Sequence, residues 1–154
     1  MNEFPLLGLQ YNVPLLTALA AMILAQFFKV LIDYWRTKSW QKALLFSTGG
    51  MPSSHSALVS SLTLSIGFRE GFASSMFAIS AALMMVVMYD SAGVRRAAGK
   101  QAEAINFLFS KLEDQGLKLD KKLKELLGHK PIEVIAGGIL GVMVAMVSEW
   151  IFIT

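Results

Sequence analysis

The sequence predicts an all-α fold: a polytopic membrane helix bundle of about four transmembrane helices plus a cytoplasmic amphipathic helical insertion. Hydrophobic residues make up 55% of the 154 positions and charged residues only 16%, whereas a soluble domain averages about 25% charged residues. Apolar segments recur at roughly the 20-residue length that a membrane-spanning helix needs. The absence of cysteine excludes thiol catalysis, zinc–thiolate sites and thiol redox switches. We therefore expect a single membrane domain covering residues 1–154.

Four segments are expected to cross the membrane. The first is interrupted only by Lys29 and Asp33, and the third carries no formal charge before Asp90. The second is short and rich in serine, so it reaches span length only by including the turn at 52–55 or by sitting partly inside the protein. The expected bounds are about 13–35, 53–69, 71–90 and 132–152.

Basic residues set the expected orientation, because cytoplasmic loops carry an excess of Lys and Arg. The first 28 residues contain neither, which argues against a secretory signal. If the N-terminus is outside, Arg36 and the nine basic residues from Arg95 to Lys130 lie in the cytoplasm, and Arg69 is left outside. We therefore expect both termini outside the cell.

The polar stretch between the third and fourth spans, about 99–130, shows helical spacing of apolar residues on both sides of Gly116. These residues are Ile105, Leu108, Phe109, Leu112, Leu119, Leu123, Leu126 and Leu127. Two amphipathic helices joined at Gly116 fit this pattern. They would lie on anionic lipid through their lysines, and binding of a partner is the alternative.

Ionisable residues inside a span are costly and therefore candidates for function. Lys29 and Arg36 are seven residues apart and share one helix face with Asp33. The alternative is a structural Lys29–Asp33 ion pair, with Arg36 reaching to the membrane surface.

The segment from Gly49 to Ser56 breaks one helix and opens the next. Its glycines and proline precede Ser53, Ser54 and His55. A helix N-terminus binds phosphate through unpaired N–H groups, and a histidine there can exchange a proton near neutral pH. The alternative is simple capping by Ser53 or Ser54, which leaves the histidine unexplained.

Two further clusters flank the insertion. Asp90 precedes the paired Arg95 and Arg96, whose alternative role is that of positive-inside anchors. His129 and Glu133 are four residues apart, so the carboxylate can hold one ring nitrogen while the other faces a substrate.

All four clusters fall on the cytoplasmic side in this topology. Cations, two imidazoles, one carboxylate and helix N-terminal amides make an anion site with acid–base or nucleophilic capacity. The sequence shows no cluster of carboxylates of the kind that binds magnesium or calcium. We therefore expect no metal and no cofactor. We also expect no nucleic-acid partner.

These clusters resemble the type 2 phosphatidic acid phosphatase superfamily, which includes the vanadium haloperoxidases. That superfamily shows Lys-x6-Arg-Pro, then Pro-Ser-Gly-His, then Ser-Arg-x5-His-x3-Asp. The Lys29-x6-Arg36 spacing matches the first motif, with Thr37 in place of proline. The run Pro52-Ser53-Ser54-His55 matches the second, with serine for glycine.

The third motif is split. Arg95 or Arg96 stands for its arginine, and His129-x3-Glu133 stands for His-x3-Asp, after an insertion of roughly 30 residues. An alignment that puts Gln101 at the histidine position is rejected, because glutamine cannot act as the nucleophile. The split resembles the divergent bacterial and plant branch described as acid phosphatase/vanadium-dependent haloperoxidase-related, and we expect a bacterial cell membrane protein.

The resemblance implies a membrane phosphatase acting on a lipid phosphate or prenyl (di)phosphate without a metal. It implies that His129 attacks phosphorus and that Glu133 orients it, while His55 serves as acid and then as base. It further implies phosphate binding by the cations and helix-start amides. The resemblance assigns no role to Asp33 and Asp90, which are candidates to hold a neighbouring cation in place. The phosphate-binding set is Lys29, Arg36, Ser53, Ser54 and Arg95 or Arg96.

Two alternatives stay open. A non-catalytic phosphate-lipid binder or scaffold would retain the anion site without chemistry.

Members of the superfamily in membranes usually have about six spans, so a homodimer would complete the fold. The Gly137-x3-Gly141 pair would then pack closely against another helix, within the chain or between chains.

Overall fold

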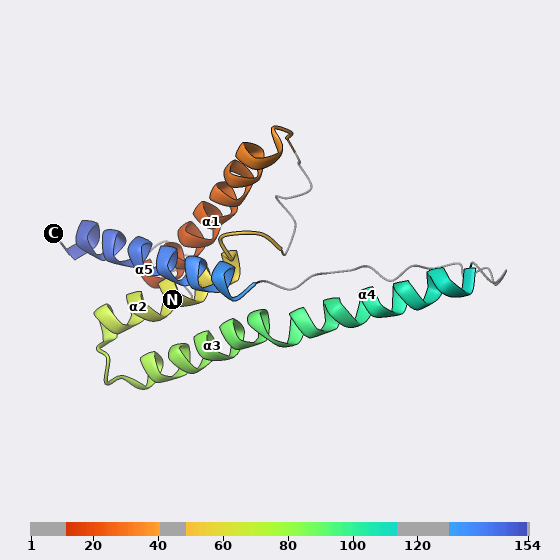
Figure 1. Cartoon of the computed structure of the whole chain (residues 1–154). Helices are drawn as coiled ribbons and strands as arrows, with labels where there is room; N and C mark the ends of the chain where they lie inside the picture. The colour runs from red at the N-terminus through yellow and green to blue at the C-terminus, as the bar shows by residue number, and fades with distance from the viewer. Residues whose placement is uncertain (1–11, 41–48, 114–129, 154) are drawn as a thin grey trace, which may run out of the picture.

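The computed structural model describes residues 12–40, 49–113 and 130–153, which form five helices (Figure 1). The described residues contain no strand, so the predicted all-α membrane helix bundle is confirmed. The helices are α1 (Val13–Thr37), α2 (Ser54–Glu70), α3 (Ser75–Ala92), α4 (Val94–Glu113) and α5 (Pro131–Ile153).

Three stretches of the described chain are long and apolar enough to cross a membrane: α1, the α3–α4 stretch Ser75–Leu112, and α5. Helix α2 is not among them, although it occupies the second expected span. It packs against α1, α3 and α5 and lies at the centre of the bundle. The serine-rich segment is therefore buried by protein, which is one of the two arrangements that its sequence allowed.

Buried hydroxyl groups are the main feature of α2. Ser56, Ser60, Ser61, Thr63 and Ser65 are all at most 5% exposed. Thr63 Oγ1 donates to the carbonyl of Val59 at 2.8 Å and to that of Ser80 on α3 at 3.0 Å. Ser60 Oγ donates within its own helix and also to the Gly138 carbonyl of α5 at 3.2 Å. These bonds satisfy the hydroxyl groups of Ser60 and Thr63, which would otherwise be costly to bury, whereas Ser61 Oγ has no hydrogen-bond partner among the described residues.

Helix α5 approaches α2 through small residues. A Cβ atom on Gly137 would overlap the backbone of Ser53, and one on Gly141 would overlap the backbone of Ala57. Glycine at both positions therefore permits close contact of the two helices. The glycine pair packs against a helix of the same chain.

Helices α3 and α4 form one long rod, and α4 extends beyond the other helices (Figure 1). The polar insertion is helical from Val94, five residues before the expected start at 99, because the chain continues from α3 with only a turn at Gly93. Gly116 and the second expected amphipathic helix lie outside the described residues.

An ion pair closes the bundle where α2 and α5 end. Arg69 Nε donates to Glu149 Oε1 at 3.0 Å, and Ser65 Oγ donates to the same oxygen at 2.5 Å. Glu149 is only 3% exposed. This pair lies at the opposite end of α5 from Pro131, and so far from the site described next.

Candidate functional site

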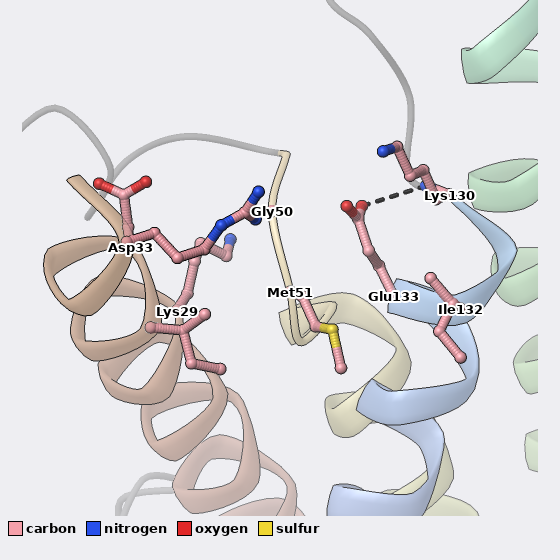
Figure 2. A pocket seen from close by; sticks show the side chains of 9 residues that line it. Lys29, Asp33, Gly50, Met51, Lys130, Ile132 and Glu133 are labelled. Carbon is pink, nitrogen blue, oxygen red and sulfur yellow. Dashed lines mark hydrogen bonds between the residues drawn. The ribbon is translucent and has the colours of Figure 1, made fainter.

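A cavity of about 200 Å³ lies between the C-terminal part of α1, the segment before α2 and the first turn of α5. Lys29 and Asp33 come from α1, and Lys130 and Glu133 come from the start of α5, with the Gly50–Met51 segment between them (Figure 2). The full lining is Lys29, Ile32, Asp33, Arg36, Gly50, Met51, Lys130, Ile132 and Glu133.

Lys29 is the most buried charged residue of this cavity, with 2% of its surface exposed. Its ammonium donates to Gln26 Oε1 at 3.0 Å and interacts electrostatically with the Glu133 carboxylate. Its aliphatic stem runs past Gly50, where a Cβ atom would lie 3.2 Å from the lysine Cγ and Cδ. Gly50 also has φ +99°, a conformation that glycine adopts without strain.

Asp33 and Arg36 follow Lys29 along α1 and line the same cavity, as their shared helix face predicts. Arg36 is exposed in the last turn of the helix. Asp33 Oδ2 is buried and has no hydrogen-bond partner among the described residues. The described residues show no Lys29–Asp33 ion pair, and the lysine ammonium donates to Gln26 Oε1.

Ser53 has a capping role, the alternative that the sequence left open. Its Oγ accepts from the N–H of Ser56, so it is the N-cap of α2. Its own N–H donates to the Glu133 carbonyl at 3.0 Å. Neither Ser53 nor the buried Ser54 lines the cavity. The Ser53 hydroxyl thus caps α2 and its amide N–H joins α2 to α5. The expected contact of Ser53 and Ser54 with phosphate stays a prediction.

Glu133 also stabilises the start of its helix. Its Oε2 accepts from the backbone N–H of Lys130 at 3.1 Å. This is the contact that a glutamate in the third helical position makes with the N-cap residue. His129, which the sequence pairs with Glu133, immediately precedes Lys130 but lies outside the described residues.

The other predicted residues are not brought into this cavity by the described part of the chain. His55 is half-buried in the first turn of α2, and Asp90 is half-buried in the last turn of α3. Arg95 and Arg96 belong to the first turn of α4, and their side chains lie outside the described residues.

Sequence reasoning missed Lys130, Gly50 and Met51 as lining residues. Lys130 carries a usable signal, because it directly precedes a proline in the first helical position and a glutamate in the third, a pattern typical of a helix start. For Gly50 and Met51 no signal existed beyond the turn itself.

The assembled site suits an anion. Its lining contains three basic side chains and two carboxylates, so basic groups are in excess. They are Lys29, Arg36 and Lys130, and Asp33 and Glu133. Charge-assisted hydrogen bonds from such groups to phosphate or carboxylate oxygens are stronger than neutral ones. A cavity of this size at the ends of two membrane-length helices can hold a small polar headgroup.

Comparison with known proteins extends across these helices. A family model described as "Divergent PAP2 family" matches residues 10–144. An uncharacterized membrane protein, YuiD, of Bacillus subtilis (strain 168) is 43% identical over 152 residues, which cover 92% of this chain and 96% of that relative. No solved structure matches this chain.

Proposed function

The chain belongs to the divergent PAP2 family, and from this premise we propose that it is an integral membrane phosphatase. Its substrate is a lipid phosphate or a prenyl (di)phosphate, and hydrolysis proceeds through a phosphohistidine without a metal. One observation carries the proposal: a nearly fully buried lysine, Lys29, shares a cavity with Arg36 and Lys130 at the ends of helices of membrane-spanning length.

The buried lysine supports function rather than stability. Burial of an ammonium group costs free energy unless partners compensate for it, and ionisable residues inside spans mark functional sites by default. Lys29 is held by Gln26 and by the field of Glu133, so its charge is fixed beside the cavity before a ligand arrives. A preorganised charge is what phosphoryl transfer needs most from a protein.

The proposed chemistry has two steps. A ring nitrogen of His129 attacks phosphorus, a P–N bond forms, and the P–O bond to the leaving group breaks as His55 gives the leaving oxygen a proton. The leaving group is the lipid alcohol for a monophosphate and the prenyl monophosphate for a diphosphate. Water then attacks phosphorus and loses a proton to His55, the P–N bond breaks, and inorganic phosphate leaves. Lys29, Arg36, Lys130 and the arginines Arg95 or Arg96 stabilise the phosphoryl oxygens.

We also propose how the site is placed in the membrane and in the assembly. The cavity faces the cytoplasm, the substrate arrives from the membrane, and two copies of the chain associate. The excess of basic residues near the cavity end supports this orientation. A detergent-solubilised mass equal to two chains checks the association, and a single-chain mass with full activity contradicts it.

Phosphate release by the purified full chain in detergent with EDTA tests the function. The substrates are phosphatidate, undecaprenyl phosphate and undecaprenyl diphosphate. We expect release by the natural chain, none by His129→Ala, and a fall in kcat/KM of about tenfold to hundredfold in Lys29→Met, since hydrogen bonds to charged groups are worth about 1.5–3 kcal/mol. Lys38→Met is the matched control, because Lys38 ends the same helix but is exposed and does not line the cavity.

A second candidate is a non-catalytic phosphate-lipid binder. It is favoured by the Ser53 N–H and the Glu133 Oε2, which are engaged in backbone contacts that stabilise helix starts. Saturable binding of phosphatidate without release, lost in Lys29→Met, would select this function. Release by an intact His129→Ala protein would reject the proposed phosphohistidine.

A further inference from the structure

An apolar groove of about 490 Å³ lies between α1 and α5. Leu24 and Phe28 line it from α1, and residues between Leu140 and Phe152 line it from α5. Ser148 is the one polar residue among the described residues that line it, and its hydroxyl lies 2.6 Å from that of Thr17. The groove therefore offers hydrocarbon contacts over almost all of its surface.

The groove and the charged cavity lie one after the other along α1, with a further hollow between them. A second apolar hollow, of about 370 Å³, is lined by Leu31, Ile32, Trp35 and Arg36. Two of these residues, Ile32 and Arg36, also line the charged cavity. Phe28 precedes Ile32 by four residues, about one helical turn, so it lies on the same face. The three hollows thus follow each other along α1.

The direction of this path matches that of a lipid in a bilayer. On α5 the charged cavity is lined by Ile132 and Glu133, and the groove begins two turns later at Leu140. From Leu140 to Phe152 the helix advances about 18 Å at 1.5 Å per residue. Both helices are of membrane-spanning length and composition, so the charged cavity lies near a membrane surface and the groove lies within the hydrocarbon.

We propose that this α1–α5 groove binds the hydrocarbon chain of the phosphate ester whose headgroup occupies the charged cavity. The inference rests on the proposed function for the identity of the headgroup. The occupant is a lipid chain because the groove leads along α1 toward a cationic cavity and is open along the membrane-facing side, where Val147 and Phe152 are 57% and 60% exposed. A chain can enter from the bilayer without passing through water.

This arrangement makes the groove a determinant of specificity. Long-chain esters gain contacts along α5 that short-chain esters cannot make. A bulky side chain in the groove should therefore lower kcat/KM for long-chain esters and leave kcat/KM for short-chain esters unchanged. Val147 is suited to this test because it lines the groove and is not part of the lining of the charged cavity.

The experiment compares Val147→Trp with Val86→Trp in the full chain. Val86 is 65% exposed on α3 and lines none of the three hollows. Phosphate release is measured with hexadecyl phosphate and butyl phosphate. We expect Val147→Trp to lower kcat/KM for hexadecyl phosphate at least tenfold and to leave that for butyl phosphate within twofold. Val86→Trp should change neither.

A second readout does not need turnover. Hexadecyl phosphate with a mid-chain diazirine is photolysed in phosphatidylcholine vesicles containing the protein, and labelled peptides are mapped. Labelling of α1 and α5 peptides that falls in Val147→Trp but not in Val86→Trp supports the groove, even if no variant releases phosphate and the proposed hydrolysis fails. Equal labelling of α3, or equal labelling by the matching hexadecanol probe, overturns the inference.

Discussion

Lys29 and Gly50 show how a single charged side chain is placed at this site. The lysine stem needs the space that a Cβ atom on residue 50 would take, and the chain turns there with φ +99°. Gln26 then accepts from the ammonium, and Glu133 contributes an opposite charge from α5. The position of the charge therefore depends on a glycine that carries no chemistry of its own.

The substitution Gly50→Ala tests this dependence, and Gly71→Ala is its control. Both glycines have positive φ, but a Cβ atom on Gly71 meets nothing within 4 Å, whereas one on Gly50 meets Lys29. Sparsely populated backbone conformations with positive φ cost a non-glycine residue about 1–3 kcal/mol, so both variants should lose stability in thermal unfolding. Only Gly50→Ala should also lower kcat/KM, by at least tenfold. Equal activity of the two variants would contradict a role for Gly50 in placing the lysine.

Part of the site was predictable from spacing, and part was not. Lys29, Asp33 and Arg36 recur on one helix face, so the sequence predicts that they line one cavity, and they do. The participation of Gly50 depends on how the chain folds back before α2, which no residue pattern encodes. Capping by Ser53 was the alternative to phosphate binding, and the cap is seen only in the structure, where Ser53 Oγ accepts from the Ser56 N–H.

At the scale of elements, the contact of α2 with α5 determines the site. The Ser53 N–H to Glu133 carbonyl bond joins the starts of both helices, and the Gly137 and Gly141 contacts continue the close packing along them. Any change that separates these helices should therefore also move Glu133 and Lys130 away from Lys29.

Alanine at Gly141 is expected to separate them. Its Cβ atom would overlap the Ala57 backbone, which cannot move aside, whereas a Cβ atom on Gly138 meets only the mobile end of Met88 at 3.2 Å. Overpacking typically costs about 1–3 kcal/mol. Thermal unfolding in detergent should show a lower Tm for Gly141→Ala and a nearly unchanged Tm for Gly138→Ala. A Gly141→Ala protein as stable as Gly138→Ala would contradict the close packing of α5 against α2.

The Arg69–Glu149 pair joins the other ends of the same two helices. Arg69→Met leaves the buried carboxylate of Glu149 without its cation. Removing one partner of a fully buried pair costs about 3–5 kcal/mol, and the loss here should be smaller because the Arg69 side chain is 31% exposed. Adding Glu149→Gln removes the charge, so the double variant should recover much of the lost stability. Unfolding of the single and double variants measures the difference. A double variant no more stable than Arg69→Met would show that the pair acts through packing and not through charge.

The helices themselves were largely readable from the sequence. Apolar length predicts α1, α3 and α5. For the short, serine-rich second segment the sequence left two arrangements open, and the structure shows the one in which it is buried inside the protein. The early start of α4 at Val94 was not readable, because a polar composition marks where an apolar span ends and not where a helix ends. The Arg69–Glu149 contact was also missed, although both residues were expected at the same side of the membrane.

At the scale of the whole molecule, the two ends of the bundle differ in charge. One end holds the cavity with three cations, and the other end holds a compensated Arg69–Glu149 pair. The rod of α3 and α4 leaves the bundle at the end where α3 finishes, beyond the other helices (Figure 1). Such asymmetry in basic residues orients a polytopic protein with its positive end in the cytoplasm.

Cysteine labelling in intact cells tests that orientation directly, because the chain has no cysteine of its own. Ser39→Cys places one thiol in the exposed segment after α1, near the cavity end, and Ala73→Cys places one in the exposed turn between α2 and α3. A membrane-impermeant maleimide should label Ala73→Cys in intact cells and Ser39→Cys only after permeabilisation. The reverse pattern would place the cavity outside the cell. The proposed phosphatase would then act on lipid phosphates of the outer leaflet, and the excess of basic residues would serve the site rather than the topology.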